Sequence, residues 1–202
     1  MSIRAVFVDY GGVILRTEDK GPRSRQAERL GLTSGDLEKI IFESKTSRQA
    51  STGEIPEEAH WQAVAEALGV SRQESDKITS EFFSGDRTNA ALLDFLRSLR
   101  PERKVGLISN AWSGLRAFIN RNKFEDVFDA MIISAEVGLM KPDPRIYRLA
   151  LEELTAKPEE SVFRDDVLVN VEAARSVGMA GIHFTQPEKA LEELKHLMNN
   201  HR

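Results

Sequence analysis

The chain has 202 residues, of which 41% are hydrophobic and 30% charged, and its formal net charge is −4 at pH 7. These values suit a globular protein with one sizeable domain, or a core domain with a small insertion, and no basic block points to nucleic acid or a membrane surface as partner. The sequence has no cysteine, which excludes disulfides and thiolate ligands; it also has no signal-peptide pattern and no apolar run of membrane-spanning length, so we expect a cytoplasmic protein.

The first predicted strand is the stretch "RAVFVD" at residues 4–9, which ends on Asp9 and is followed closely by Gly11 and Gly12. A buried strand that ends on an aspartate brings a carboxylate to the edge of its sheet. In open α/β sheets, ligands bind outside the carboxyl ends of the strands. Asp9 is therefore a candidate functional residue, and the alternative is an aspartate that caps the next turn.

Residues 17–85 are helical in pattern throughout, and Ser34 suits a helix cap. This stretch is too long for a simple crossover between two strands. We therefore predict a helical cap domain, residues 17–85, inserted into an α/β core domain formed by residues 1–16 and 86–202. The predicted hinges are the polar segments at residues 16–20 and 84–87, the second of which contains a glycine.

Four further apolar runs, separated by helical patterns, follow the insertion; they lie at residues 104–110, 128–134, 161–166 and 179–184. Strands that alternate with helices form a parallel sheet with helices on both faces. The predicted fold is therefore an α/β, Rossmann-like core of three layers with an inserted helical cap. The tail at residues 187–202 has the pattern of a terminal amphipathic helix.

Polar residues stand at or just after the ends of the later strands: Ser109, Asn110, Lys141, Asp165 and Asp166. Each could be a turn former, a solvated lysine or a helix cap, but their joint placement at successive strand ends favours one site. A cluster of carboxylates is costly without a cation, and oxygen ligands suit Mg²⁺. Lysine and serine could hold a phosphoryl group while Asp9 attacks phosphorus.

The stretches "VFVDYGGVI", "GLISN", "GLMKPDPRIY" and "VFRDDVLVNVEAARSVGM" together resemble, in order, the four motifs of the haloacid dehalogenase superfamily. The resemblance covers essentially the whole chain, including a helical cap of the C1 type. It implies that Asp9 is the nucleophile, that Ser109 and Asn110 bind the phosphoryl group, and that Lys141 bridges nucleophile and substrate. It also implies a Mg²⁺ site formed by Asp165, Asp166, Asp9 and the backbone carbonyl of Gly11.

Gly11 is a departure from that pattern, because most phosphatases of the superfamily have a second aspartate there for general acid–base catalysis. The "DYGG" sequence resembles the glycine variant grouped with the N-terminal domain of soluble epoxide hydrolase. Loss of that group matters least when the leaving group is already stable as an anion, as in acyl, aryl or anomeric phosphates.

Arg164 and residues of the predicted cap carry further expectations. Arg164 stands in a strand where an apolar residue is usual, and we expect a partly exposed sheet edge or a carboxylate partner. The resemblance places the turn at residues 53–55 above the active site, which makes Glu54 and His60 candidates for substrate contacts. For His60, a surface position is the favoured alternative, and Trp61 is expected in the core of the cap.

The sequence thus predicts a magnesium-dependent phosphatase that acts on a small phosphorylated metabolite through an aspartyl-phosphate, with a preference for activated leaving groups. One alternative is a 2-haloacid dehalogenase, in which Asp9 attacks carbon and no metal is needed. Another is a weakened family member that binds a phosphorylated ligand or a partner protein. We expect no nucleic-acid or membrane partner and a monomer or homodimer.

Overall fold

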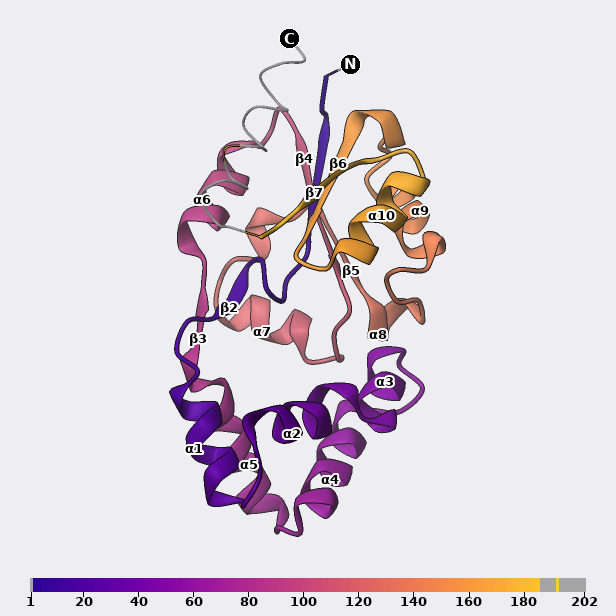
Figure 1. Ribbon diagram of the computed structural model, residues 1–202. Coiled ribbons are helices and arrows are strands. Elements are labelled where there is room, and N and C mark those ends of the chain that lie inside the picture. Colours follow the sequence, from indigo (N-terminus) through magenta and orange to yellow (C-terminus); the bar gives the residue numbers. More distant parts are fainter. Residues whose placement is uncertain (1, 186–191, 193–202) are drawn as a thin grey trace.

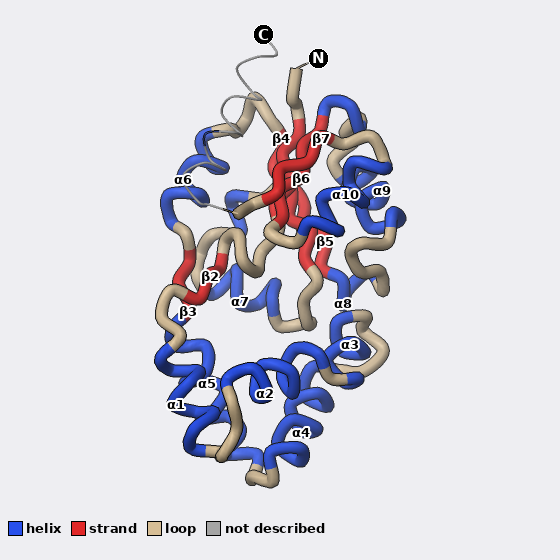
Figure 2. Tube along the Cα trace, in the orientation of Figure 1, coloured by secondary structure: helices blue, strands red, loops and turns tan. Residues whose placement is uncertain are grey.

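The computed structural model describes residues 2–185 and residue 192, and the predicted terminal helix at 187–202 lies almost entirely outside them. Within the described residues, a central parallel sheet has the strand order β5-β4-β1-β6-β7. The strands are β1 (Ala5–Val8), β4 (Lys104–Ser109), β5 (Ala130–Ile133), β6 (Ser161–Asp165) and β7 (Ala180–His183). They correspond to the five predicted runs, and Figures 1 and 2 show them in the upper half of the molecule.

Helices cover both faces of this sheet, so the predicted three-layer α/β fold is confirmed. In β1, Val6 and Val8 face one core together with residues from α6 and α7, whereas Ala5 and Phe7 face a second core with residues from α9 and α10. This alternation follows from the two-residue period of a strand. The helices of the core are α6 (Ala90–Ser98), α7 (Leu115–Arg121), α8 (Ser134–Val137), α9 (Pro144–Glu153) and α10 (Leu168–Ser176), with the short turns η3 (Glu125–Val127) and η4 (Pro158–Glu160).

A helical insertion follows the first strand and lies below the sheet in Figure 1. It has its own apolar centre, which includes Leu37, Ile41 and Phe82. Its elements are α1 (Gly21–Arg29), α2 (Ser34–Glu38), the π-helical turn η1 (Lys39–Glu43), α3 (Lys45–Ser51), α4 (Glu57–Leu68), α5 (Arg72–Phe82) and the turn η2 (Phe83–Gly85). The cap of α2 is Thr33, one residue before the predicted Ser34, because the Thr33 hydroxyl accepts a hydrogen bond from the Asp36 amide.

The predicted hinge segments overlap a short antiparallel ribbon. It consists of β2 (Leu15–Thr17) and β3 (Asp86–Thr88). The Thr17 hydroxyl donates to Asp86, 2.7 Å away, and Arg23 of α1 donates to the same carboxylate. The two chain segments that join the insertion to the core are therefore paired with each other and tied to the first helix of the insertion.

Arg164 corrects the expectation of a partly exposed edge. It lies in β6 between β1 and β7 and is only 1% exposed. Its guanidinium carbon lies 4.3 Å from the ring centroid of Phe184, so an aromatic face covers the charge inside the sheet layer.

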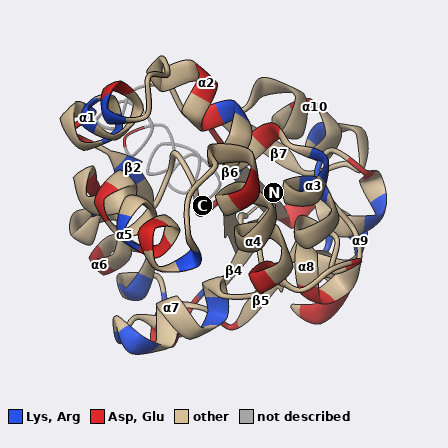
Figure 3. Cartoon of the chain, turned by 90° about the horizontal axis from the view of Figure 1, so that it is seen from below, with Lys and Arg blue, Asp and Glu red and all other residues tan. Residues whose placement is uncertain are grey.

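Surface charge is mixed in sign on the helical insertion. Figure 3 views the chain from that side and shows acidic and basic residues interspersed along the helices. Across the part of the chain that the structure describes, no helix combines the length and apolar character that crossing a membrane requires.

Candidate active site

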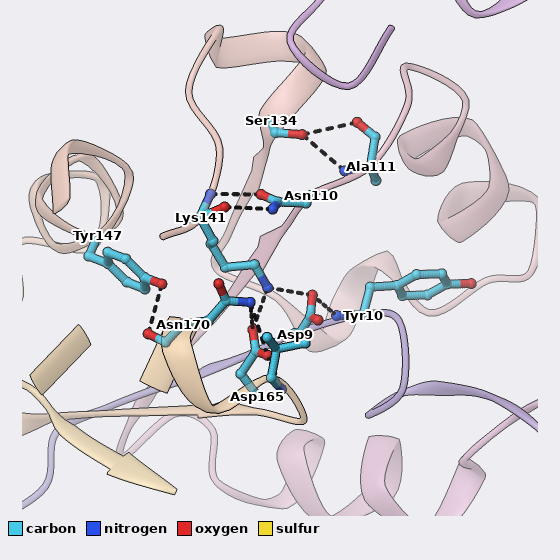
Figure 4. Close-up of polar contacts among 10 residues, drawn as sticks. Asp9, Tyr10, Asn110, Ala111, Ser134, Lys141, Tyr147, Asp165 and Asn170 are labelled. Carbon is cyan, nitrogen blue, oxygen red and sulfur yellow. Dashed lines mark hydrogen bonds and ion pairs between the residues drawn. The ribbon is translucent and has the colours of Figure 1, made fainter. Parts of the chain in front are cut away.

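Lys141 links two carboxylates at the carboxyl ends of the central strands. Its Nζ lies 2.8 Å from Oδ1 of Asp9, which follows β1, and 2.6 Å from Oδ2 of Asp165, the last residue of β6 (Figure 4). All three side chains are largely or fully buried. The backbone amide of Tyr10 also donates to Oδ1 of Asp9, at 2.7 Å. Three residues that are distant in sequence thus meet in one desolvated ion cluster.

The charge balance of this cluster affects Asp9. Burial, which disfavours the ionised form, raises the pKa of the Asp9 carboxyl from 3.8 to about 6; the attraction of Lys141 opposes this rise and the repulsion of Asp165 adds to it. A single ammonium group faces two carboxylates here, so part of the negative charge is left uncompensated. A bound cation would remove that imbalance.

Asp165 is held by donors on both of its oxygens. The Asn170 amide nitrogen lies 3.2 Å from Oδ1 and 3.1 Å from Oδ2, and the Val167 backbone amide donates to Oδ1 at 2.7 Å. The Tyr147 hydroxyl in turn donates to the backbone carbonyl of Asn170 at 2.8 Å, as Figure 4 shows. These contacts fix the orientation of the Asp165 carboxylate.

Asp166 completes an acidic cluster. Oxygen atoms of Asp9, Asp165 and Asp166 all lie within 4.8 Å of one another, and such a group could hold a metal ion. Partial burial and the repulsion of Asp165 raise the pKa of the Asp166 carboxyl. Clustered carboxylate oxygens are the donor set that Mg²⁺ prefers, so these residues fit the predicted cation.

Ser109 and Asn110 lie at the end of β4, next to this cluster. Ser109 is 2% exposed. The Asn110 side chain makes two hydrogen bonds with the Lys141 backbone: its Nδ2 donates to the carbonyl at 2.9 Å, and its Oδ1 accepts from the amide at 2.8 Å. Asn110 therefore positions the Lys141 segment, and the second hydrogen of its amide nitrogen stays available for another acceptor.

Gly11 and Gly12 differ sharply in their surroundings. A methyl group added to Gly11 would meet nothing within 4 Å, whereas one added to Gly12 would lie 2.0 Å from Oδ2 of Asp166. Gly12 also has a φ of +72°, a conformation that strains other residues. The fold thus demands a glycine at position 12 but leaves open space for a side chain at position 11.

The insertion contacts the core close to these residues. The Trp112 indole nitrogen, two positions after Asn110, donates to the Ser47 carbonyl at 3.3 Å, and Glu57 accepts from the Gly114 amide at 2.7 Å. At the turn after α3, a methyl group on Gly53 would lie 2.3 Å from the Ala135 carbonyl oxygen. The turn at residues 53–55 therefore packs against the core.

His60 and Glu54 have different surroundings within the insertion. His60 is fully buried, which corrects the expected surface position; its Nδ1 lies 3.0 Å from the Thr46 hydroxyl, and burial lowers its pKa. Its ring packs against those of Trp61 and Trp112, with centroids 5.2 and 4.8 Å away. Glu54 is exposed and accepts from the Thr52 hydroxyl at 3.0 Å.

A family model described as haloacid dehalogenase-like hydrolase matches residues 3–178. The chain belongs to that family. Its similarity to "Bifunctional epoxide hydrolase 2" of Rattus norvegicus is 32% identity over 215 residues, covering 96% of this chain and 39% of the relative. The hydrolase thus spans about two fifths of the length of that relative. It is 26% identical to "Sesquiterpene phosphatase astK" of Aspergillus oryzae, with 98% of this chain and 97% of the relative covered.

A solved structure shares the fold of this hydrolase. It is a haloacid dehalogenase family enzyme of Bacteroides thetaiotaomicron in complex with magnesium and inorganic phosphate. The TM-score is 0.74 and the identity 24%, over 90% of this chain and 94% of that one.

Sequence reasoning found the strand-end residues of the hydrolase but not those that support them. Asp9, Lys141, Asp165 and Asp166 do come together at one sheet edge, with Ser109 and Asn110 at the end of the neighbouring strand. Asn170 and Tyr147 were missed. Asn170 stands five positions after Asp165, in the first turns of α10, which is the one sequence signal that could have suggested its contact with that carboxylate.

Proposed function

We propose that this hydrolase is a magnesium-dependent phosphatase that acts on a small phosphorylated metabolite through an aspartyl-phosphate on Asp9. The observation that carries the proposal is the position of Lys141 Nζ, 2.8 Å from Asp9 and 2.6 Å from Asp165, within an acidic cluster. A carboxylate nucleophile, an ammonium group and oxygen ligands for a cation are what transfer of a dianionic phosphoryl group requires.

In the proposed reaction, an Asp9 carboxylate oxygen attacks phosphorus. The bond between phosphorus and the leaving-group oxygen breaks, and the electron pair departs with that oxygen. Water then attacks the phosphorus of the aspartyl-phosphate, which releases inorganic phosphate and restores the carboxylate. Lys141 offsets negative charge on the phosphoryl oxygens during both steps, and Ser109 and Asn110 donate hydrogen bonds to them.

The proposed ligands of Mg²⁺ are Asp9, Asp165, Asp166 and the backbone carbonyl of Gly11. When bound, the cation neutralises charge on the transferring group. Asp165 serves from a fixed orientation, because Asn170 and the Val167 amide hold it. The magnesium and inorganic phosphate bound by the Bacteroides thetaiotaomicron enzyme and the phosphatase name of the Aspergillus oryzae relative support this assignment.

The leaving group in this proposal is one that departs without a proton from the enzyme. Gly11 supplies no carboxylate for that purpose, and the fold does not exclude one. Residues 17–85 serve as the cap, with the turn at residues 53–55 and Glu54 near the substrate. His60 supports the cap by packing against the Trp61 and Trp112 rings.

The test is hydrolysis of acetyl phosphate and p-nitrophenyl phosphate, each with magnesium and with a chelator. Turnover that requires both magnesium and Asp9 supports the proposal. Chloride release from 2-chloropropionate without magnesium would instead indicate a dehalogenase. Binding of phosphate without turnover of any phosphate ester or anhydride would indicate a protein that only binds phosphorylated ligands.

A further inference from the structure

Phe42 is a large apolar side chain that is 42% exposed, although it belongs to an aromatic cluster. It lies in η1, the π-helical turn that continues α2. Such turns are rare and frequently occur at functional sites. Figure 1 shows α2 and the following turns on the side of the insertion that is nearest to the sheet.

The Phe42 ring stacks on Trp112, which belongs to the core. Their ring centroids are 5.9 Å apart and the planes differ by 11°. Trp112 follows Asn110 by two residues and lies just beyond the end of β4. The pair therefore joins the insertion to the segment that leads out of the proposed phosphoryl-binding residues.

Trp112 of this pair also packs against Trp61, and hydrogen bonds hold both of these indoles in place. Trp112 donates to the Ser47 carbonyl, and Trp61 donates to Glu57 at 3.1 Å. The two indole rings are 5.1 Å apart and nearly perpendicular. Because Trp112 is held by its own neighbours, the surface that it forms with Phe42 is already in place before any ligand binds.

We propose that Phe42 and Trp112, which we call the aromatic wall, bind the leaving group of the substrate, and that this group is a planar aromatic ring. The substrate class is then the aryl phosphates. This inference rests on the proposed function and narrows it. Aromatic rings favour offset or edge-to-face packing against other rings, and the exposed part of Phe42 offers such a contact.

A second, independent feature favours an aryl group over an alkyl chain. Gly11 provides no acid for the leaving group, and a phenolate departs as a stable anion where an alkoxide does not. The ring that suits the aromatic wall is therefore also the ring that the reaction can release unaided.

The experiment compares two inert ligands, so that the leaving-group chemistry has no influence. Benzylphosphonate and cyclohexylmethylphosphonate have the same connectivity and charge, and only the first is planar and aromatic. Calorimetric titration of the magnesium-loaded full chain gives both dissociation constants. We expect benzylphosphonate to bind about 3- to 10-fold more tightly, the range that aromatic pairing provides beyond apolar burial.

Variants show which residues produce the difference between the two dissociation constants. Phe42→Leu should bring the ratio of the two constants close to one, whereas Phe42→Tyr, which retains the ring, should preserve it. Val169→Ala is the matched control, because Val169 is a comparably exposed apolar residue, 52% exposed, outside the aromatic wall. Thermal melting of each variant checks that it is folded.

Each result decides the inference. A ratio near one in the wild-type protein, or no binding of either phosphonate, would overturn the aryl assignment if acetyl phosphate is still hydrolysed with magnesium. A ratio that survives in Phe42→Leu would also overturn it, and if that ratio falls in Val169→Ala the ring lies against α10 instead. Absence of magnesium-dependent acetyl phosphate hydrolysis would count against the proposed function itself.

Discussion

A methyl group on Gly12 would lie 2.0 Å from Oδ2 of Asp166, so the loop after β1 and the acidic cluster are in direct steric contact. The neighbouring Gly11 has no such contact, since a methyl group there meets nothing within 4 Å. Gly12 is therefore required by the geometry of the fold. At Gly11 no steric contact requires a glycine, so the missing carboxylate there bears on the chemistry of the site and not on its packing. The two adjacent glycines are therefore explained separately.

Gly11→Asp should fold and should change the leaving-group preference. An added carboxyl can protonate an alkoxide, so we expect hydrolysis of glycerol phosphate to rise by up to about 10²-fold. Hydrolysis of p-nitrophenyl phosphate should change little, because its phenolate needs no proton. Gly12→Ala is the control, and we expect it to lower the melting temperature. An unchanged alkyl-to-aryl rate ratio in a stable Gly11→Asp protein would mean that leaving-group protonation is not limiting.

Asp9→Asn should reduce turnover of p-nitrophenyl phosphate by about 10³-fold or more, because the amide is a far weaker nucleophile. Steady-state rates and circular dichroism of the variant provide the measurement. A variant with wild-type rates would exclude the covalent route through Asp9.

The same variant should alter how stability depends on pH in metal-free protein. The pKa of the Asp9 carboxyl is raised from 3.8 to about 6 on folding, so the folded state binds the extra proton. The Asp9 contribution to unfolding free energy is thus full below the unfolded pKa and is lost as pH rises through about 6. Relative to wild type, Asp9→Asn should gain up to about 3 kcal/mol between about pH 4 and about pH 7. Denaturant titrations in chelator at both pH values measure this difference.

Asp166→Ala should weaken magnesium binding by at least about 10-fold, the lower end of what loss of an outer partner alone causes. Without metal it should gain stability, because one member of a repelling carboxylate cluster is removed. Calorimetry with magnesium and thermal melting in chelator test both effects. Asp76→Ala, which removes an exposed acid paired with Arg72, is the control that should leave magnesium affinity unchanged.

Asn170→Ala should lower activity and magnesium affinity by about 10- to 100-fold, since Asp165 loses a donor that contacts both of its oxygens. Tyr147→Phe removes only the hydrogen bond to the Asn170 carbonyl and should cost about 1 kcal/mol of stability. If Asn170→Ala binds magnesium as tightly as wild type, Asn170 does not position the metal ligand.

Beryllium fluoride, a phosphate mimic, should slow hydrogen exchange at residues 53–55. This turn packs so closely on the core that Gly53 has no space for a methyl group beside the Ala135 carbonyl. A ligand that stabilises the closed arrangement should therefore protect these amides. Equal exchange with and without the ligand would show that the turn does not respond to an occupied site.

The sheet and the strand-end residues could be predicted because each depends on a local pattern. An apolar run, its polar end and the following helix are all visible within one short stretch, and parallel strands bring their carboxyl ends together. His60 was also within reach of pattern analysis: it precedes Val64 by four residues on α4, and both face the buried side of that helix.

The remaining features depend on partners that are far away in sequence. The burial of Arg164 is stabilised by Phe184, and no local pattern shows that an aromatic ring will lie over a guanidinium group. Tyr147 reaches Asn170 across the contact between two helices. The pairing of β2 with β3 joins two three-residue segments that are separated by the whole insertion.

That pairing has a consequence for how this hydrolase could be rebuilt. Thr17 stands opposite Asp86 in the last pair of the ribbon, so in terms of chain connectivity residues 18–85 form the loop of a single β-hairpin. Long loops cost little more chain entropy than short ones, and a tight turn can join two antiparallel strands. We therefore expect that replacing residues 18–85 with an Asn-Gly turn leaves a foldable α/β protein. A different helical module grafted at the same two positions should keep the strand ends that carry Asp9 and Asp165 intact.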